Sequence, residues 1–440
     1  MGDTEVMTTL SASGVRPRGG FGLFWASQAA GAAGDRLSGF TAPTVAILVL
    51  GASDAEVGVV AAAGWLAYPA VGLLAGALLA RARVRRVVVG AELVRFTAFA
   101  AIAAAVVCGW LTSVVPLVAA VALAGVATVF VDLGNQVQLP ALVPAGRLVG
   151  ANSRLQGTDS ASKLAGPALG GAAVGALGPA AALALGALPF LLSASCRARV
   201  PAPTVAAPVA APAGREPVAL RVRDGLRFTC RHPVLGPLVT SGAVRALGTG
   251  AVDAVLLLFA YRVLGMSAAG TGLLLAAGAA GALVGVLCVG PLVNALGPRR
   301  ALLASVAEGL TWCAVPLCLV LPAPVPVLFA IRVLSAFWTP AWGVVGTSVR
   351  QRLAPPERQA AVHGTTRVLV SSAIPLGSLG GGLVAGAASG PLGPPTALAC
   401  VIVAGGLCIA GSALLLPSHI PADRPNTPRE DRCTRRPAGS

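Results

Sequence analysis

The chain has 440 residues, of which 56% are hydrophobic and 11% are charged, and its formal net charge is +16. Soluble domains are about 45–50% apolar and about 25% charged, so this composition excludes an ordinary soluble domain and indicates a membrane protein. In a soluble chain the basic charge would suggest nucleic acid. Here the arginines lie between long apolar runs, where the preference of basic residues for the cytoplasmic side explains them, and we expect no nucleic-acid partner.

Twelve apolar runs follow one another along the chain, and a helix needs about 20 such residues to cross a lipid bilayer. The first six cover about 21–51, 57–79, 92–110, 114–138, 149–177 and 180–196, and the second six begin near residues 234, 267, 301, 325, 360 and 394. We expect an all-α polytopic membrane protein with twelve transmembrane helices, in two six-helix bundles at 21–196 and 234–417.

Three segments lie outside these bundles. Residues 1–20 lack an apolar core followed by a cleavage site, so we expect a cytoplasmic tail and not a cleaved signal peptide. Residues 197–233 alternate proline with alanine and then become rich in arginine, which is typical of a cytoplasmic linker. Residues 418–440 are rich in proline and arginine, and we expect a disordered cytoplasmic tail.

The loop arginines are distributed unevenly between the two sides of the membrane. If the runs cross in turn, Arg262 stands nearly alone on one side. The other side, which also holds both termini, carries Arg16, Arg18, Arg81, Arg83, Arg85, Arg86, Arg147, Arg197, Arg199, Arg299, Arg300, Arg350, Arg352 and Arg358, besides those of the linker and the tail. Because basic loops stay in the cytoplasm, both termini are predicted to be cytoplasmic.

A basic turn between two apolar runs occurs twice, as 76–86 and 290–300. In both copies glycine allows two helices to approach closely, and arginines hold the turn outside the hydrocarbon. The pattern resembles the loop signature of the major facilitator superfamily, although Ala80 and Asn294 replace its acidic residue. The resemblance implies a gating role for these loops, with the candidate residues Gly76, Arg81, Arg85, Arg86, Gly290, Asn294, Gly297, Arg299 and Arg300.

A second pattern is also duplicated. Residues 144–147 followed by 166–171 are echoed by 355–358 followed by 377–382. Two repeated patterns at nearly equal spacing predict two parallel six-helix repeats, and the superfamily fold implies a substrate path between them at the middle of the membrane.

The segment Gly166-Pro-Ala-Leu-Gly-Gly171 follows Leu139-Pro-Ala-Leu-Val-Pro144. Together they resemble a branch of the superfamily that contains enterobactin exporters and macrolide-efflux-like proteins, and the first segment also resembles the fifth-span signature of drug/proton antiporters. Pro167 would bend the helix, and Gly166, Gly170 and Gly171 would provide a flat face on which a neighbouring helix can slide. Ordinary packing of small residues is the alternative interpretation.

Charged residues inside the apolar runs are costly in lipid and therefore indicate functional or paired sites. Asp35 lies deepest in the first bundle, and Arg245 and Asp253 of the seventh run are its candidate partners. Asp35 either takes up the coupling proton or forms a permanent ion pair that holds the first and seventh runs together. Arg332 resembles the arginine motif that many antiporters use in the fourth span, but it stands in the second bundle.

The remaining charges favour structural pairs. Glu92 and Arg95 are spaced for an i, i+3 pair, and Asp159 and Lys163 for an i, i+4 pair. Asp132 is expected to pair with Arg147 or another loop arginine. Glu308 and Arg332 are candidates to pair with each other or with Asp132 across helices.

A few aromatic and amide side chains are candidates to line the substrate path: Trp25, Gln28, Trp65, Tyr68, Trp338 and Trp342. Anchoring at the membrane interface is an equal alternative for the tryptophans. Because so few polar lining residues are evident, an apolar or amphipathic substrate is expected.

The sequence contains no catalytic triad, phosphate-binding loop or dinucleotide fingerprint, and its nine cysteines and three histidines show no metal-ligand spacing. We therefore expect no enzyme activity, cofactor or metal. The leading interpretation is a monomeric secondary transporter in a bacterial inner membrane that exports a small hydrophobic or amphipathic molecule, such as a drug, natural product or siderophore, by proton antiport. An importer of a small metabolite and a non-transporting sensor or scaffold are the alternatives.

Overall fold

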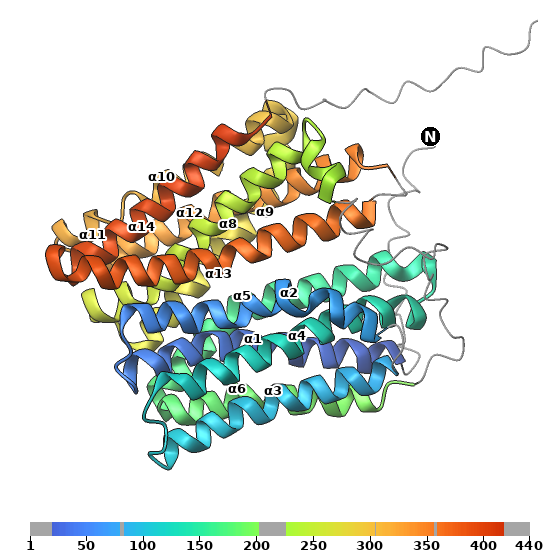
Figure 1. The fold of residues 1–440 in the computed structure, drawn as a ribbon, viewed down its shortest axis with the longest axis horizontal. Coiled ribbons are helices and arrows are strands. Elements are labelled where there is room, and N and C mark those ends of the chain that lie inside the picture. Colours follow the sequence, from blue (N-terminus) through green and yellow to red (C-terminus); the bar gives the residue numbers. More distant parts are fainter. Residues whose placement is uncertain (1–19, 80–82, 202–225, 304, 356–358, 418–440) are drawn as a thin grey trace, which may run out of the picture.

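A computed structural model describes residues 20–79, 83–201, 226–303, 305–355 and 359–417 (Figure 1). The predicted N-terminal tail, most of the linker, the C-terminal tail, Arg81 and Arg358 lie outside the described residues. The regular structure of the described part is entirely helical. Nine of its helical segments are long and apolar enough to cross a membrane.

The first bundle contains six long helices. They are α1 (Gly20–Leu48), α2 (Asp54–Leu79), α3 (Val84–Val107), α4 (Val114–Leu142), α5 (Leu148–Leu177) and α6 (Pro179–Ala198), with a short 3-10 turn η1 (Ala145–Arg147) before α5. We call these helices the N bundle.

The second bundle is less regular. It contains α8 (Leu235–Leu258), the π-helical η2 (Phe259–Val263), α9 (Ala268–Leu303), α10 (Ser305–Trp312), α11 (Leu317–Val320), α12 (Pro324–Leu353), α13 (Gln359–Leu392), α14 (Pro394–Gly411) and η4 (Ser412–Leu415). We call these helices the C bundle.

Single glycines followed by proline break the helices at three places. Gly178, Gly297 and Gly393 have φ values of 83°, 78° and 77°, and each precedes a proline. Glycine tolerates this backbone region because it has no Cβ, and proline is favoured in the first turn of the helix that follows. The turn predicted within 290–300 is confined to Gly297, the one residue of α9 with non-helical φ and ψ, and helical structure continues on both sides of it.

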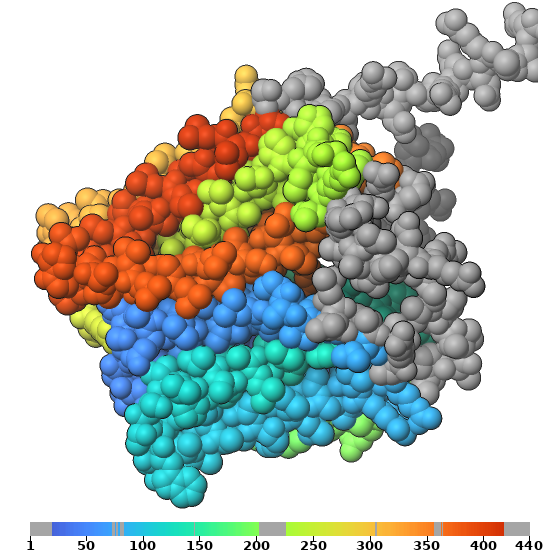
Figure 2. Space-filling view, in the orientation of Figure 1, coloured from blue at the N-terminus to red at the C-terminus, as the bar shows by residue number. Residues whose placement is uncertain are grey.

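The two bundles lie side by side and meet mainly along two helix pairs, α2 with α13 and α5 with α9 (Figure 1). On the face shown in Figure 2, α13 (orange) lies directly against α2 (blue). The described chain begins and finishes at one end of the molecule, which we call the terminal end. The opposite end, where α1 joins α2 and α5 joins α6, is called the loop end.

Buried apolar side chains join the bundles at the loop end. The largest cluster draws on both bundles, with Val45, Leu117 and Leu183 from one and Leu256 and Leu398 from the other. Towards the terminal end the clusters are smaller and each belongs to one bundle. The bundles are thus packed together at the loop end and packed separately at the terminal end.

Candidate functional site

A cavity of about 1720 Å³ lies between the bundles. It is large enough for a drug-sized molecule, whose binding sites usually measure about 300–1,000 Å³. Along α5 its lining extends from Leu164 to Val149, in the first turn of that helix, so the cavity reaches the terminal end.

The two walls of the cavity differ, because the N bundle supplies polar side chains together with apolar ones such as Val60, Phe99 and Val121, whereas the C bundle supplies only apolar ones. The N bundle lines it with charged and polar side chains, among them Gln28, Asp35, Arg36, Tyr68, Glu92, Arg95, Asp132, Asn135, Asn152, Gln156, Asp159 and Lys163. The C bundle contributes Ala279, Ala282, Leu283 and Val286 of α9, which are all apolar. The expectation of few polar lining residues was therefore wrong, because polar residues scattered through α1, α4 and α5 converge on one wall.

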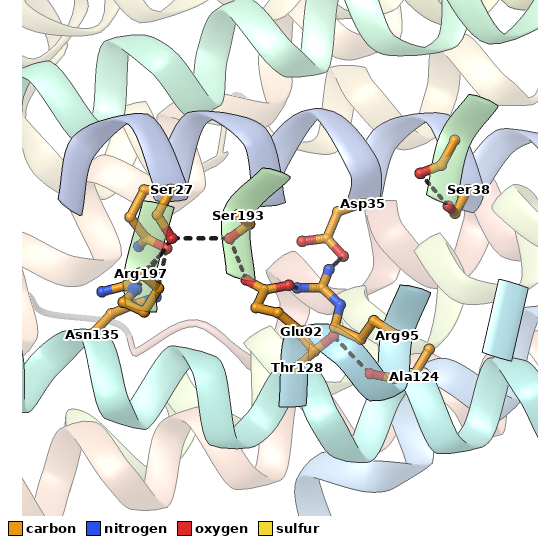
Figure 3. Close-up of polar contacts among 12 residues, drawn as sticks. Ser27, Asp35, Ser38, Glu92, Arg95, Ala124, Thr128, Asn135, Ser193 and Arg197 are labelled. Atoms are coloured by element: carbon orange, nitrogen blue, oxygen red, sulfur yellow. Dashed lines mark hydrogen bonds and ion pairs between the residues drawn. The ribbon is translucent and has the colours of Figure 1, made fainter. Parts of the chain in front are cut away.

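Asp35 pairs with Arg95 of α3 (Figure 3). The predicted partners were Arg245 and Asp253, so this prediction was wrong. Arg95 also donates to Glu92 at 3.0 Å, which confirms the predicted i, i+3 pair, and its guanidinium lies 4.0 Å from the centre of the Phe190 ring. Arg95 and Glu92 are buried, whereas 43% of the Asp35 side chain is exposed. One arginine thus serves two carboxylates, of which only Asp35 is readily reached from the cavity.

A hydrogen-bonded chain continues from Glu92 to Arg197 (Figure 3). Ser193 donates to Glu92 at 2.8 Å, and the hydroxyls of Ser27 and Ser193 are 2.9 Å apart. The Nε of Arg197 donates to Ser27 at 3.1 Å. Because the Ser193 proton is directed to Glu92, Ser27 must donate to Ser193, so all donors in this chain are directed from Arg197 towards Glu92.

Arg197 is fully buried, although the sequence placed it at the start of the linker. Its two Nη atoms donate to Gln138 at 2.8 Å, Asn135 at 2.7 Å and Gln28 at 3.2 Å, and its guanidinium lies 4.4 Å from the Phe24 ring centre. The sequence does contain a signal for this network. Gln28, Asn135 and Gln138 are polar side chains inside apolar helices, and buried polar groups need hydrogen-bond partners.

The C bundle contains a second ion pair, in which Arg245 of α8 bonds Glu308 of α10. Arg245 also lies 5.7 Å from the ring of Trp342, which is 7% exposed. Neither Asp132 nor Arg332 is the partner of Glu308, so the predicted pairings of this glutamate were wrong. The two bundles therefore each link their first and third long runs by an ion pair, with the signs of the charges exchanged.

The other predicted residues of the C bundle lie outside the lining of the cavity. Arg332 lies over Trp312 at 5.7 Å, and its buried Nε finds no hydrogen-bond partner within the described part of the chain. Asp253 is exposed and lies within the electrostatic reach of Arg332. Trp338 is half-buried against Phe337. Among the predicted path residues, the lining includes Gln28, Asp35, Trp65 and Tyr68 of the N bundle.

At the loop end, glycines bring the bundles into backbone contact. A Cβ at Gly171 of α5 would collide with the carbonyl oxygen of Ala268, and one at Gly272 of α9 with that of Pro167. Gly58 of α2 and Gly382 of α13 approach each other in the same way. The remaining glycines of the fifth-span pattern pack inside the N bundle, Gly166 on Arg36 and Gly170 on Phe40.

Polar contacts reinforce the closed loop end. Arg262 donates to the Asp54 carboxylate and to the carbonyl oxygen of Ala52 across the two bundles. Ser389 of α13 also donates to Asp54, at 3.2 Å, and the hydroxyls of Tyr261 and Thr44 are 3.2 Å apart. The π-helical η2 carries both Tyr261 and Arg262.

Nearer the terminal end, Asp132 of α4 accepts from Tyr68 and from Arg367 of α13, the latter at 3.1 Å. The predicted pair with Arg147 is absent, because Arg367 crosses from the C bundle to this carboxylate. The predicted pair of Asp159 with Lys163 is confirmed at 2.6 Å, and Arg36 joins it at 3.0 Å.

The duplicated basic turns make equivalent contacts in the two bundles. Arg85 donates to the carbonyl oxygen of Val200, just after α6, at 2.9 Å. Arg299 donates to that of Pro417, just after η4, at 3.3 Å. Each turn is thus bonded to the chain that leaves the last helix of its own bundle, while Arg86, Gly290, Asn294 and Arg300 are exposed.

Comparisons with known proteins place this architecture. A mutant of the nucleoside transporter NupG superposes with a TM-score of 0.71 at 13% identity, covering 89% of this chain and 99% of that one. A bacterial homologue of the iron transporter ferroportin superposes with a TM-score of 0.65 in its inward-facing state (19% identity, 89% and 98% covered) and 0.56 in its outward-facing state (19% identity, 90% and 98% covered).

No curated protein sequence matches the chain. The model of the Major Facilitator Superfamily, however, matches residues 24–307 and 238–439, which together include nearly all of both bundles. The chain is therefore a multi-pass membrane protein that belongs to the Major Facilitator Superfamily of transporters.

Proposed function

We propose that this transporter exports a small amphipathic molecule by alternating access between the two bundles. The observation that carries the proposal is the two-walled cavity. A polar group of the substrate would bond the wall formed by the N bundle, and its apolar part would contact Ala279, Ala282, Leu283 and Val286 of α9. The drug-like substrate expected from the sequence meets both requirements.

The state of the cavity supports alternating access. Backbone contacts and the Asp54–Arg262 pair close the loop end, whereas the apolar clusters at the terminal end leave the bundles separate. The higher TM-score to the inward-facing ferroportin homologue agrees with this state. With both termini in the cytoplasm, the structure would be the one that loads substrate from inside the cell.

The polar network supports proton coupling at Asp35. This carboxyl is partly exposed to the cavity, and its partner Arg95 is buried with a second carboxylate, Glu92. If Asp35 takes up a proton, Arg95 keeps the Glu92 charge and is not left alone in a region of low dielectric constant. Proton uptake would then loosen α1 from α3 at small cost.

The bundles 21–196 and 234–417 would be six-span repeats, twelve spans in all, in a monomer of the bacterial inner membrane. Arg245, Asp253, Arg332, Trp338 and Trp342 would form the second half of the path after the bundles rearrange, and the basic turns would act as gates. The efflux branch remains a proposal that rests on the fifth-span pattern.

Accumulation of a panel of fluorescent lipophilic dyes in cells that express the protein tests the proposal, with and without a protonophore. Expression should lower dye accumulation, and the protonophore and Asp35→Asn should each restore it. Glu56→Gln makes the same chemical change on an exposed capping residue of α2 and should leave export unchanged. Higher accumulation on expression would show import instead, and no change with a correctly inserted protein would reject dye transport.

A further inference from the structure

Arg367 reaches across from the C bundle into the polar wall of the cavity. One Nη atom of Arg367 donates to Oδ2 of Asp132 at 3.1 Å, and the guanidinium lies 5.2 Å from the centre of the Tyr68 ring. The hydroxyl of Tyr68 donates to the same Oδ2, so neither of these two bonds uses Oδ1 of Asp132. Trp65 lies beside Tyr68, with ring centres 6.1 Å apart, and is 43% exposed.

A carboxylate beside two partly exposed aromatic rings is the chemistry that binds an organic cation. The carboxylate forms charge-assisted hydrogen bonds, and the electron-rich ring faces attract positive charge. Asp132, Tyr68 and Trp65 all line the cavity. The guanidinium of Arg367 therefore occupies a site that is built for a cationic ligand group.

The other cavity-lining carboxylates are neutralised within their own bundle. Asp35 and Glu92 share Arg95, and Asp159 is held by Arg36 and Lys163. Asp132 alone among them is paired with a residue of the C bundle. Loss of that partner would leave the folding of the N bundle intact and would free a carboxylate inside the cavity.

We propose that the transported molecule is an organic cation, and that its cationic group replaces Arg367 at Asp132, Tyr68 and Trp65. This inference rests on the proposed function and names its substrate class. The replacement is feasible because the side chains of Arg367 and Asp132 are 41% and 36% exposed, and half-exposed ion pairs contribute little stability. The hydrophobic part of the cation would then contact the α9 wall.

The exchange would also couple substrate binding to movement. The Arg367–Asp132 bond joins α13 to α4, nearer the terminal end than the glycine contacts. A substrate that takes over Asp132 removes this ion pair between the bundles and leaves only its own apolar contact with α9 on the side of the C bundle. Binding would thus favour movement of the bundles relative to each other.

Calorimetric titration of the full-length protein in lipid nanodiscs tests the exchange. The probe is biphenyl-4-carboxamidine, whose amidinium resembles the Arg367 guanidinium, and biphenyl-4-carboxamide is its uncharged analogue. Wild type should bind the amidine more tightly than the amide. Arg367→Ala removes the competitor and should lower the Kd of the amidine by about twofold to fivefold. Asp132→Asn should raise it about tenfold, because a charge-assisted bond is lost.

Two controls complete the design. Arg367→Lys restores a cation and should return the Kd to the wild-type value. Arg154→Ala removes an exposed arginine of α5 that does not line the cavity and should have no effect.

Weaker amidine binding by Arg367→Ala would overturn the proposal, since it would make Arg367 a ligand of the substrate and not its substitute. Equal binding of amidine and amide by all variants would also overturn it. Asp132→Asn could lose amidine binding because it misfolds. Arg367→Ala is predicted to bind the amidine more tightly, and a misfolded variant cannot produce that result. If dye export persists while the cation preference is absent, the proposed function stands and only this inference falls.

Discussion

Arg197 shows how far the position of a residue in the sequence can mislead about its environment. It follows a long apolar run and precedes the proline-rich segment, so it was interpreted as a linker arginine. In the structure it is fully buried, and its guanidinium donates to Ser27, Gln138, Asn135 and Gln28. It is therefore the centre of a network that joins α1, α4 and α6.

Arg197→Lys should destabilise the protein although the charge is kept. An ammonium group has three donors on one atom and cannot serve four oxygens that a planar guanidinium reaches in separate directions. Each buried acceptor left without a donor costs about 1–3 kcal/mol. Thermal unfolding of the purified protein in detergent measures the change, and Arg199→Lys, two residues later and exposed, is the matched control. Equal melting temperatures for the two variants would show that the network contributes nothing to stability.

Local spacing predicted the short-range pairs, Glu92 with Arg95 and Asp159 with Lys163, because residues three or four apart share one face of a helix. It did not predict that Asp35 meets Arg95, that Arg245 meets Glu308, or that Asp132 meets Arg367. These partners stand on different helices, and their contact depends on how each helix is rotated about its axis. An apolar run shows that a helix exists. It does not define the rotation of the helix about its axis, because the side that faces lipid and the side that faces protein are both apolar.

At the scale of elements, the apolar runs predicted the long helices well, including the beginnings of α8, α9, α12 and α14 to within one residue. The second basic turn was placed correctly and is short, because the helical hydrogen bonding of α9 resumes directly after Gly297. The glycines of the fifth-span pattern were expected to contact one neighbour. They instead divide between α1 of the same bundle and α9 of the other, which sequence periodicity cannot distinguish.

Gly171→Ala should open the loop end. A methyl group there collides with the backbone of α9, whereas at Gly175, one turn further along the same face, the nearest atom is 3.9 Å away. Both changes add a favourable helix former, worth up to about 1 kcal/mol, so only the collision distinguishes them. A cysteine placed at the cavity-lining Ala42, in a protein without its native cysteines, should react faster with a thiol reagent applied from the loop end in Gly171→Ala than in Gly175→Ala. Equal rates would contradict a seal formed by helix contact at Gly171.

At the scale of the whole molecule, composition was sufficient to predict an all-helical membrane protein, and the repeated motifs indicated the superfamily. The distribution of charge across the bundles could not be predicted from composition and motifs. The polar wall belongs to the N bundle and the apolar wall to α9, so the two bundles are similar in fold and different in chemistry. The paired charges of the C bundle, Arg245 and Glu308, are not among the residues that line the cavity.

The orientation of the molecule in the membrane can be tested with two native cysteines. Cys108 is exposed after α3 at the loop end, and Cys230 is exposed before α8 at the terminal end. Described arginines are concentrated at the terminal end, where Arg85, Arg199 and Arg299 lie, so from the positive-inside rule we predict that this end faces the cytoplasm. In intact cells, a membrane-impermeant maleimide should label a variant that keeps only Cys108 and spare one that keeps only Cys230. After permeabilisation both variants should react. Labelling of Cys230 alone in intact cells would show the opposite orientation. The open cavity would then load its substrate from outside the cell.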